Sequence, residues 1–127
     1  MGTGYVEGFI AKARADQEVL AVILFGSYAR GEERLGSDLD ICLVLKLADY
    51  SNLDLSRKKL AYLKSFNLDV QVYQQLPLYI RRRVLKEGEI LFCRDEEALY
   101  ELAFHTIQEF EDFKHIYYGY LAEVAHV

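Results

Sequence analysis

The sequence is poor in residues that interrupt or cross-link a chain. It holds one proline, Pro77, and two cysteines, Cys42 and Cys93. No stretch rich in proline, glycine or serine divides the chain, and it contains neither internal repeats nor low-complexity tracts. We therefore expect residues 1–127 to form a single domain, long enough to bury a hydrophobic core without cross-links.

The cysteine pattern argues against a disulfide bond and against a structural metal site. Cys42 and Cys93 each lie inside an apolar run, and neither belongs to a Cys-x-x-Cys pair. We expect both to act as small buried hydrophobic residues, with neither a disulfide nor a zinc site. This usage suits the reducing cytosol.

Targeting and membrane segments are missing as well. The N-terminus lacks a positively charged start followed by an apolar core, and no uncharged apolar stretch is long enough to span a bilayer. We expect a soluble cytoplasmic protein with no membrane partner.

The chain also lacks a surplus of positive charge. Its formal net charge is −5, so the surface as a whole will not attract nucleic acid, and we do not expect direct nucleic-acid binding. Arg81–Arg83 with Lys86 is the best candidate for a local basic patch, for nucleic acid or an acidic partner. The same residues are also typical of a solvated helix face.

Two apolar runs flank the polar segment around which the chain is organised. Val22–Phe25 and Ile41–Leu45 are apolar at every position, which indicates strands buried on both faces of a sheet covered by helices. Gly26-Ser27 follows the first run, and Asp38 and Asp40 precede the second. Turn residues and carboxylates therefore lie at the ends of two buried strands.

The remaining patterns complete an α/β fold. Leu68–Tyr73 alternates, with Leu68, Val70 and Val72 on one side and Asp69, Gln71 and Tyr73 on the other, and Glu89–Cys93 is a fourth strand. Helices are predicted at Tyr5–Arg14, Leu53–Phe66, Pro77–Lys86 and from Asp95 to Leu121. For Leu53–Phe66 we predict an apolar face of Leu53, Leu60, Leu63 and Phe66, with Arg57, Lys58, Lys59 and Lys64 facing outward. The expected fold is a small mixed sheet of about four strands flanked by helices.

Three carboxylates of these strands favour a metal site. Asp38 and Asp40, two positions apart, point to the same side of a strand and repel each other unless a cation lies between them. Mg²⁺, a hard cation with oxygen ligands, is the natural counter-charge. Asp69, on the polar side of another strand, can add a third carboxylate, and three carboxylates suit phosphoryl or nucleotidyl transfer. An acidic turn at a strand entry is the alternative.

Gly26 and Ser27 complement this metal site. A glycine permits close backbone approach, free N–H groups of a turn suit phosphate oxygens, and Ser27 adds a hydroxyl donor. A triphosphate held there would place its α-phosphorus beside the metal ions. A turn glycine and a helix-capping serine are the alternative reading.

The spacing Gly26-Ser27, ten residues, then Asp38-Leu39-Asp40 resembles the signature of the polymerase-β-like nucleotidyltransferase superfamily, with Asp69 in the place of its third carboxylate. The fuller string GSYARGE…SDLDICL resembles the minimal nucleotidyltransferase (MNT) proteins, the antitoxins of HEPN–MNT toxin–antitoxin pairs. The resemblance covers Gly26 to Asp69, the middle third of the chain, and implies the polymerase-β-like fold with a long C-terminal helix.

The resemblance also implies roles. Gly26 and Ser27 would hold the nucleotide phosphates, Asp38, Asp40 and Asp69 would bind Mg²⁺, and Asp69 would help to deprotonate the attacking hydroxyl. Arg30 either orients phosphates or forms a structural salt bridge. ATP would be the donor, and AMP would pass to a tyrosine of a partner HEPN ribonuclease toxin.

Two other functions stay open. The chain could transfer a nucleotide to a small molecule or an RNA end, although such relatives usually carry a further acceptor domain for which we expect no room here. It could instead be a non-catalytic antitoxin that only masks its toxin, which the intact set of three aspartates argues against.

The last predicted helix carries aromatic side chains on more than one side. Phe104, Tyr100 and Tyr118 do not share the face of Phe110 and Phe113. Since one domain core cannot cover every side of such a helix, we predict that part of it docks a partner or a second copy, as in a homo-oligomer. The three histidines, His105, His115 and His126, lie in the same C-terminal region. His105 and His115 are nearly three helical turns apart, too far to share a metal, and we expect all three to be ordinary helix or surface residues.

Overall fold

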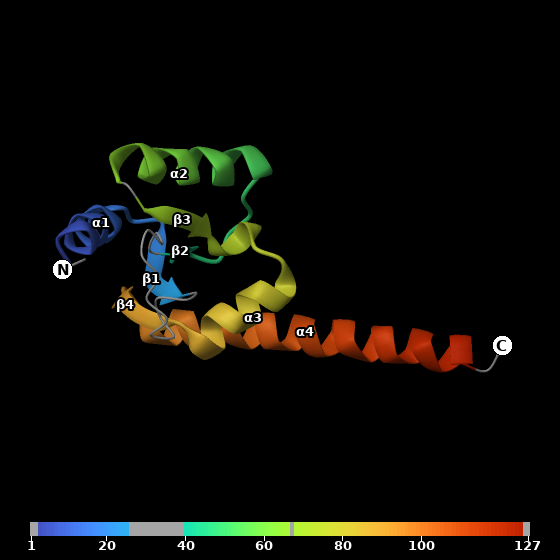
Figure 1. The fold of residues 1–127 in the computed structure, drawn as a ribbon. Coiled ribbons are helices and arrows are strands. Elements are labelled where there is room, and N and C mark those ends of the chain that lie inside the picture. The colour runs from blue at the N-terminus through green and yellow to red at the C-terminus, as the bar shows by residue number, and fades with distance from the viewer. Residues whose placement is uncertain (1–2, 26–39, 67, 126–127) are drawn as a thin grey trace, which may run out of the picture.

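The computed structural model describes residues 3–25, 40–66 and 68–125 (Figure 1). Of the predicted site residues, Gly26, Ser27, Arg30 and Asp38 lie outside the described residues, and Asp40 and Asp69 lie within them. The elements in chain order are α1 (Thr3–Ala15), β1 (Val19–Phe25), β2 (Asp40–Leu45), α2 (Asn52–Ser65), β3 (Asp69–Val72), the 3₁₀ turn η1 (Tyr73–Gln75), α3 (Leu78–Glu87), β4 (Glu89–Cys93) and α4 (Glu96–Ala125).

One mixed sheet of four strands forms the centre, in the order β3-β2-β1-β4. β1 pairs antiparallel with both β2 and β4, whereas β2 and β3 run parallel. A parallel pair needs a long crossover connection, and α2 supplies it. The expected small mixed sheet flanked by helices is confirmed.

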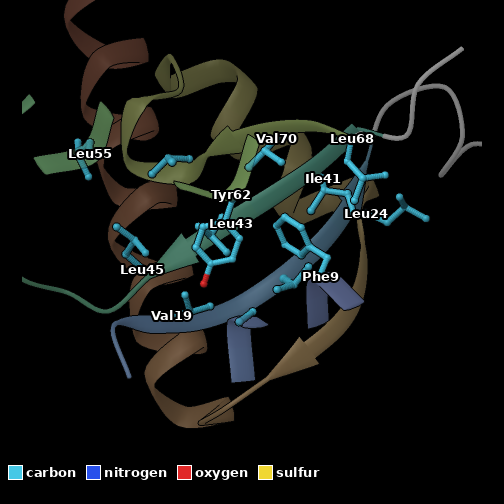
Figure 2. Packing of buried hydrophobic residues seen from close by; sticks show 13 residues of the cluster. Phe9, Val19, Leu24, Ile41, Leu43, Leu45, Leu55, Tyr62, Leu68 and Val70 are labelled. Carbon is cyan, nitrogen blue, oxygen red and sulfur yellow. The ribbon is translucent and has the colours of Figure 1, made fainter. Parts of the chain in front are cut away.

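The two faces of the sheet bury separate clusters of side chains. On one face, α1 and α2 cover alternate residues of β1, β2 and β3, which include Val22, Ile41, Leu43, Val70 and Val72 (Figure 2). On the other face, α3 and α4 cover a second cluster, which includes Ile23, Cys42, Tyr73, Val84 and Leu102. The continuous apolar runs are therefore buried on both sides, as their composition predicts.

The predicted apolar face of α2 is wrong. Leu53 and Leu60 are 58% and 53% exposed and Leu63 is exposed too, while Leu55 and Tyr62 fill the core. Leu55 and Tyr62 are two helical turns apart on one stripe, and this stripe, with fewer leucines, is the one that reaches the sheet. Phe66 follows the prediction, because its ring packs edge-on against Phe9 with centroids 5.4 Å apart.

The lysines of α2 correct a second part of that prediction. Lys58 and Lys59 are half-buried and bonded to groups on other elements, whereas Arg57 and Lys64 are exposed as expected. Lys58 pairs with Asp16 at 2.9 Å and with Glu18 at 2.6 Å. Long side chains bury their stems while the charged end finds a partner, which a hydrophobicity pattern cannot show.

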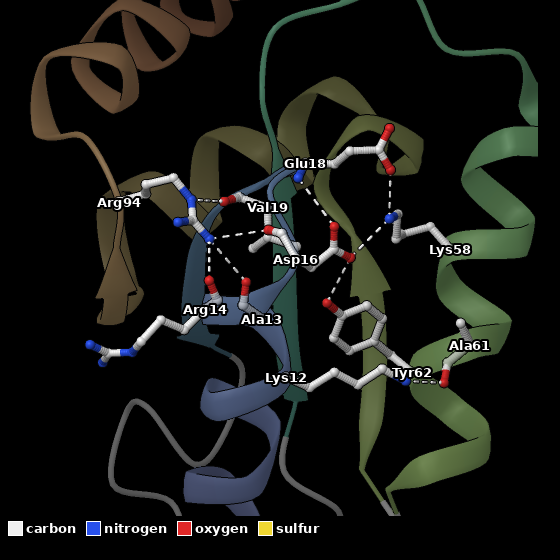
Figure 3. Close-up of polar contacts among 10 residues, drawn as sticks. All are labelled: Lys12, Ala13, Arg14, Asp16, Glu18, Val19, Lys58, Ala61, Tyr62 and Arg94. Carbon is white, nitrogen blue, oxygen red and sulfur yellow. Dashed lines mark hydrogen bonds and ion pairs between the residues drawn. The ribbon is translucent and has the colours of Figure 1, made fainter.

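Arg94, between β4 and α4, ties the last turn of α1 to the sheet (Figure 3). Its guanidinium donates hydrogen bonds to four backbone carbonyl oxygens, those of Ala13, Arg14, Asp16 and Val19. A helix leaves its last carbonyls without internal partners, so one arginine here satisfies several at once. The start of α4 is thereby fixed to the body of the domain.

Asp16 ties α1 to α2 (Figure 3). Its carboxylate accepts hydrogen bonds from the Tyr62 hydroxyl at 3.0 Å, from Lys58 and from the backbone N–H of Glu18. Burial alone would raise the pKa of the Asp16 carboxyl, but these hydrogen bonds and the charge of Lys58 hold that pKa below its ordinary value.

A substitution at Asp16 tests this junction. Asp16→Asn should lower the free energy of unfolding at pH 7 by about 1–2 kcal/mol, because Lys58 loses one of its two charged partners. Since the folded-state pKa of Asp16 lies below its unfolded value, the wild-type advantage is present above about pH 4 and disappears as the pH falls through the folded pKa. Urea unfolding between pH 3 and 7 measures this, with exposed Asp49→Asn as control. A pH-independent difference would contradict it.

Gly88, at the end of α3, packs too closely for a side chain. A Cβ atom there would lie 2.4 Å from Ile23 Cγ2 and 2.4 Å from the carbonyl oxygen of Val84. Gly88→Ala should therefore reduce the free energy of unfolding by about 1–3 kcal/mol. Gly119→Ala is the control, because nothing lies within 4 Å of that position, and helix propensity there favours alanine. Thermal and urea unfolding compare the two, and equal stability of both variants would refute the steric argument.

Candidate active site

Asp40 and Asp69 start two neighbouring strands. Asp40 is the first residue of β2, Asp69 is the first residue of β3, and the two are direct partners in the parallel pairing. Paired strands lie about 4.8 Å apart, so the two carboxylates project from adjacent backbone positions. The sequence predicted that Asp69 would join Asp40 from a different strand, and the register brings these two residues together.

Strand alternation assigns a face to the pair. Asp40 shares its side of β2 with Cys42 and Asp69 shares its side of β3 with Gln71, on the face covered by α3 and α4. Both aspartates are half-buried at the strand starts, whereas Ile41 and Val70, the next residues of the two strands, are buried. Two carboxylates therefore meet at one edge of the sheet, directly after the chain segment that carries Asp38.

A hydrogen-bonded chain holds Asp69. The Nε2 of Gln71 donates to Asp69 Oδ1 at 3.1 Å, and Lys59 Nζ of α2 donates to Gln71 Oε1 at 3.3 Å. This arrangement fixes the Asp69 side chain and places the positive charge of Lys59 behind it. The sequence predicted that Gln71 lies on the same side of the strand as Asp69 but assigned Gln71 no role. It predicted Lys59 to face solvent, whereas Lys59 bonds to Gln71.

The donor set fits Mg²⁺. Oxygen atoms of two carboxylates side by side are hard ligands, and their mutual repulsion is relieved by a divalent cation. Within the described ranges, no group of three or more His, Cys, Asp or Glu side chains could hold a metal ion. The predicted third carboxylate, Asp38, and the predicted phosphate-binding residues Gly26, Ser27 and Arg30 lie outside those ranges.

An open cleft lined by polar residues lies elsewhere in the described part of the chain. A cleft of about 830 Å³ surrounds the far end of β2 and is lined by Asp16, Lys46, Tyr50 and Lys58, among others. Because β2 begins at Asp40 and ends at Leu45, this cleft is at the opposite end of the strand from the two aspartates. Three of its charged groups form ion pairs with one another, Lys58 with Asp16 and with Glu18, so we assign the site by chemistry and not by volume.

The predicted basic patch Arg81–Arg83 is engaged within the domain. Each of the three guanidinium groups has a partner, and two of the partners fasten α3 to α4. The partners are, in order, Glu109 at 3.2 Å, the ring of Phe110 at 4.7 Å from its centroid, and Glu87 at 3.3 Å. The structural reading of these arginines is therefore the better one.

The remaining candidate residues lie apart from the aspartates. Cys42 is fully buried in the second cluster, where burial raises the pKa of its thiol, and Cys93 is half-buried at the end of β4. His105 and His115 are exposed on α4. No helix of the part of the chain that the structure describes is long and apolar enough to cross a membrane.

Comparison with known proteins agrees with this geometry. The family model described as polymerase beta, nucleotidyltransferase matches residues 8–97, which contain β1 to β4 and both aspartates. A proposed protein adenylyltransferase of Methanocaldococcus jannaschii is 33% identical over 75 residues, which cover 59% of this chain and 57% of that protein. The matched region thus spans less than two thirds of that relative.

Solved structures share the fold. A toxin–antitoxin structure with AMP-PNP matches with a TM-score of 0.66 at 20% identity, over 93% of this chain and 97% of that chain. A structure of tri-AMPylated Shewanella oneidensis HEPN toxin in complex with MNT antitoxin matches with a TM-score of 0.62 at 17% identity, over 93% and 94%. At these identities the likeness shows the fold.

The family match covers most of the chain, including the paired strands that carry Asp40 and Asp69, and the fold of solved MNT antitoxins extends over α4 as well. The chain therefore belongs to the polymerase beta nucleotidyltransferase family.

Proposed function

We propose that this protein is a Mg²⁺-dependent nucleotidyltransferase that transfers AMP from ATP to a tyrosine of a partner HEPN-type toxin. The observation that carries the proposal is the register of β2 and β3, which pairs Asp40 with Asp69 at one edge of the sheet. Asp38, Asp40 and Asp69 would hold Mg²⁺, which when bound supplies charge neutralisation for the reacting phosphate.

The residues of the chain divide the remaining work. Gly26 and Ser27 hold the nucleotide phosphates and Arg30 orients them, as the family resemblance implies. Asp69 accepts the proton of the attacking tyrosine hydroxyl, whose oxygen bonds to the α-phosphorus of ATP while the bond from that phosphorus to the bridging oxygen of the β-phosphate breaks and pyrophosphate leaves. Gln71 and Lys59 keep the Asp69 carboxylate oriented through the hydrogen bonds described above. Catalysis then depends on positioning the reacting groups and stabilising charge in the transition state, because the protein itself forms no covalent intermediate in such a direct transfer.

Two comparisons support the donor and the acceptor. One structure of similar fold is a toxin–antitoxin with AMP-PNP, an ATP analogue, and another contains a tri-AMPylated HEPN toxin with its MNT antitoxin. The relative from M. jannaschii is described as acting on proteins by adenylyl transfer. These properties belong to those proteins, and their agreement favours a protein acceptor for this chain over a small molecule or an RNA end.

Replacing the paired aspartates tests the reaction. Asp40→Asn and Asp69→Asn keep the size of each side chain but remove its charge, so each should reduce transfer by more than about 100-fold. Labelled ATP, Mg²⁺ and the protein encoded by the adjacent gene are incubated together, and label on that protein is counted. Asp49→Asn, an exposed aspartate at the other end of β2, is the matched control and should transfer like wild type.

The outcomes separate the possible functions. Equal labelling by wild type and the Asp40→Asn variant refutes catalysis at this site. Loss of labelling with full neutralisation of the toxin identifies masking as the antitoxin mechanism. Labelling of an RNA end or an aminoglycoside, but of no protein, refutes the proposed acceptor.

Gln71 gives a finer test of the same site. Gln71→Leu cannot donate to Asp69 or accept from Lys59, so we expect an activity loss of about 10- to 100-fold. A higher Mg²⁺ concentration should be needed for half-maximal transfer, which simple loss of stability would not produce. Lys59→Met should shift the Mg²⁺ requirement in the same direction, and exposed Lys64→Met on the same helix serves as its control. An unchanged Mg²⁺ dependence in Gln71→Leu would exclude the positioning role.

A further inference from the structure

The buried stripe of α4 continues beyond the body of the domain. Leu99, Leu102 and Thr106 are the buried residues of this helix. At about 100° per residue, the same face carries Phe110 and then a set of side chains that we call the distal stripe. The distal stripe consists of Phe113, Tyr117, Tyr120, Leu121 and Val124.

The distal stripe is exposed because the domain ends beneath it. Among the residues that the structure describes, the contacts with the body that lie farthest along α4 are the hydrogen bond between Thr106 and Tyr73, the Arg81–Glu109 ion pair and the stacking of Arg82 on Phe110. Figure 1 shows the rest of α4 projecting past the other elements. Phe113 is 58% and Tyr120 63% exposed, although each lies on the face of α4 that is buried at Leu102 and Thr106.

The projecting half leaves the domain away from the aspartates. Asp40 and Asp69 are at the starts of β2 and β3, whereas Tyr73 follows the end of β3. Thr106 contacts Tyr73, so α4 passes the far end of β3 before it projects. A protein bound to the distal stripe is therefore held at a distance from the transfer site.

The acidic residues beside the distal stripe indicate which kind of partner fits this surface. One flank of the distal stripe carries Asp112 and Glu123, and the only Lys or Arg between residues 107 and 125 is Lys114. An antiparallel second copy would place this acidic flank against its own equivalent, and like charges at flanking positions oppose pairing. A membrane with anionic lipids is disfavoured for the same reason. A protein with an apolar groove and basic residues along one edge is complementary.

We propose that the distal stripe of α4 is the docking surface for the acceptor protein, which presents an apolar groove bordered by Lys or Arg. The inference rests on the proposed function for the identity of that partner. Because docking and transfer occupy opposite ends of the domain, the partner must extend from α4 to the Asp40–Asp69 edge. Docking and chemistry should then be lost independently.

The test uses the full chain and, as probe, the purified protein encoded by the adjacent gene. Tyr117→Ser/Leu121→Ser should raise the dissociation constant at least about 30-fold, because central aromatic and aliphatic anchors carry most of an interface's affinity. Tyr118→Ser, an exposed tyrosine on another side of α4, is the matched control and should change it less than about 2-fold. Circular dichroism verifies that the variants remain helical.

The charge argument has its own variant. Asp112→Lys/Glu123→Lys should weaken binding and reduce its dependence on salt, since basic residues of the partner lose their complement. Unchanged affinity and salt dependence in this variant would overturn the assignment of a basic partner.

The result distinguishes failure of docking from failure of the proposed function. If Asp40→Asn binds the probe like wild type but does not label it, and Tyr117→Ser/Leu121→Ser loses affinity for the probe, both proposals hold. If the Tyr117→Ser/Leu121→Ser variant binds and labels normally, the docking surface is refuted and the transferase remains. If wild type docks through the stripe but never labels the probe, the proposed function fails alone. A wild-type dimer in sedimentation that this variant abolishes, without binding of the probe, assigns the stripe to a second copy.

Discussion

The parallel pairing of β2 with β3 is the constraint on which the candidate site depends. Had these strands been joined by a hairpin, their starts would lie at opposite edges of the sheet and Asp40 would face the end of β3. The crossover through α2 instead aligns both starts, so that Asp40 and Asp69 become direct neighbours. Chain topology thus makes neighbours of the two carboxylates that we propose as ligands of a divalent cation, each contributed by a different strand.

The crossover helix α2 aligns the starts of β2 and β3 and also supports the Asp40–Asp69 pair with its side chains. Leu55 and Tyr62 bury one stripe of α2 against the sheet, and Lys59, on the same helix, reaches Asp69 through Gln71. The Tyr62 hydroxyl also donates a hydrogen bond to the Asp16 carboxylate, and this bond joins α2 to the end of α1. Packing, a polar junction and the orientation of a candidate catalytic carboxylate therefore share one element.

The sequence was most informative where burial leaves a periodic pattern. The continuous runs of β1 and β2 and the alternation from Leu68 to Tyr73 identified the strands, and the spacing between Gly26-Ser27 and Asp38-Leu39-Asp40 indicated the family that the comparison confirmed. The face of α2 was missed because leucines outnumber the residues that contact the sheet, and only the crossover geometry decides between stripes. Gln71 and Lys59 could not be assigned roles, since their hydrogen bonds join separate elements and leave no periodic trace.

The projecting half of α4 has a thermodynamic consequence. Its turns lack the tertiary packing that stabilises most protein helices, and an isolated helix of this length is marginal in water. Its amide hydrogens are accordingly protected by local hydrogen bonds alone and belong to the part of the molecule that opens most readily. A partner that covers this segment therefore also orders it, so part of the interaction energy is spent on conformational entropy, and the bound helix gains a rigidity that the free helix lacks.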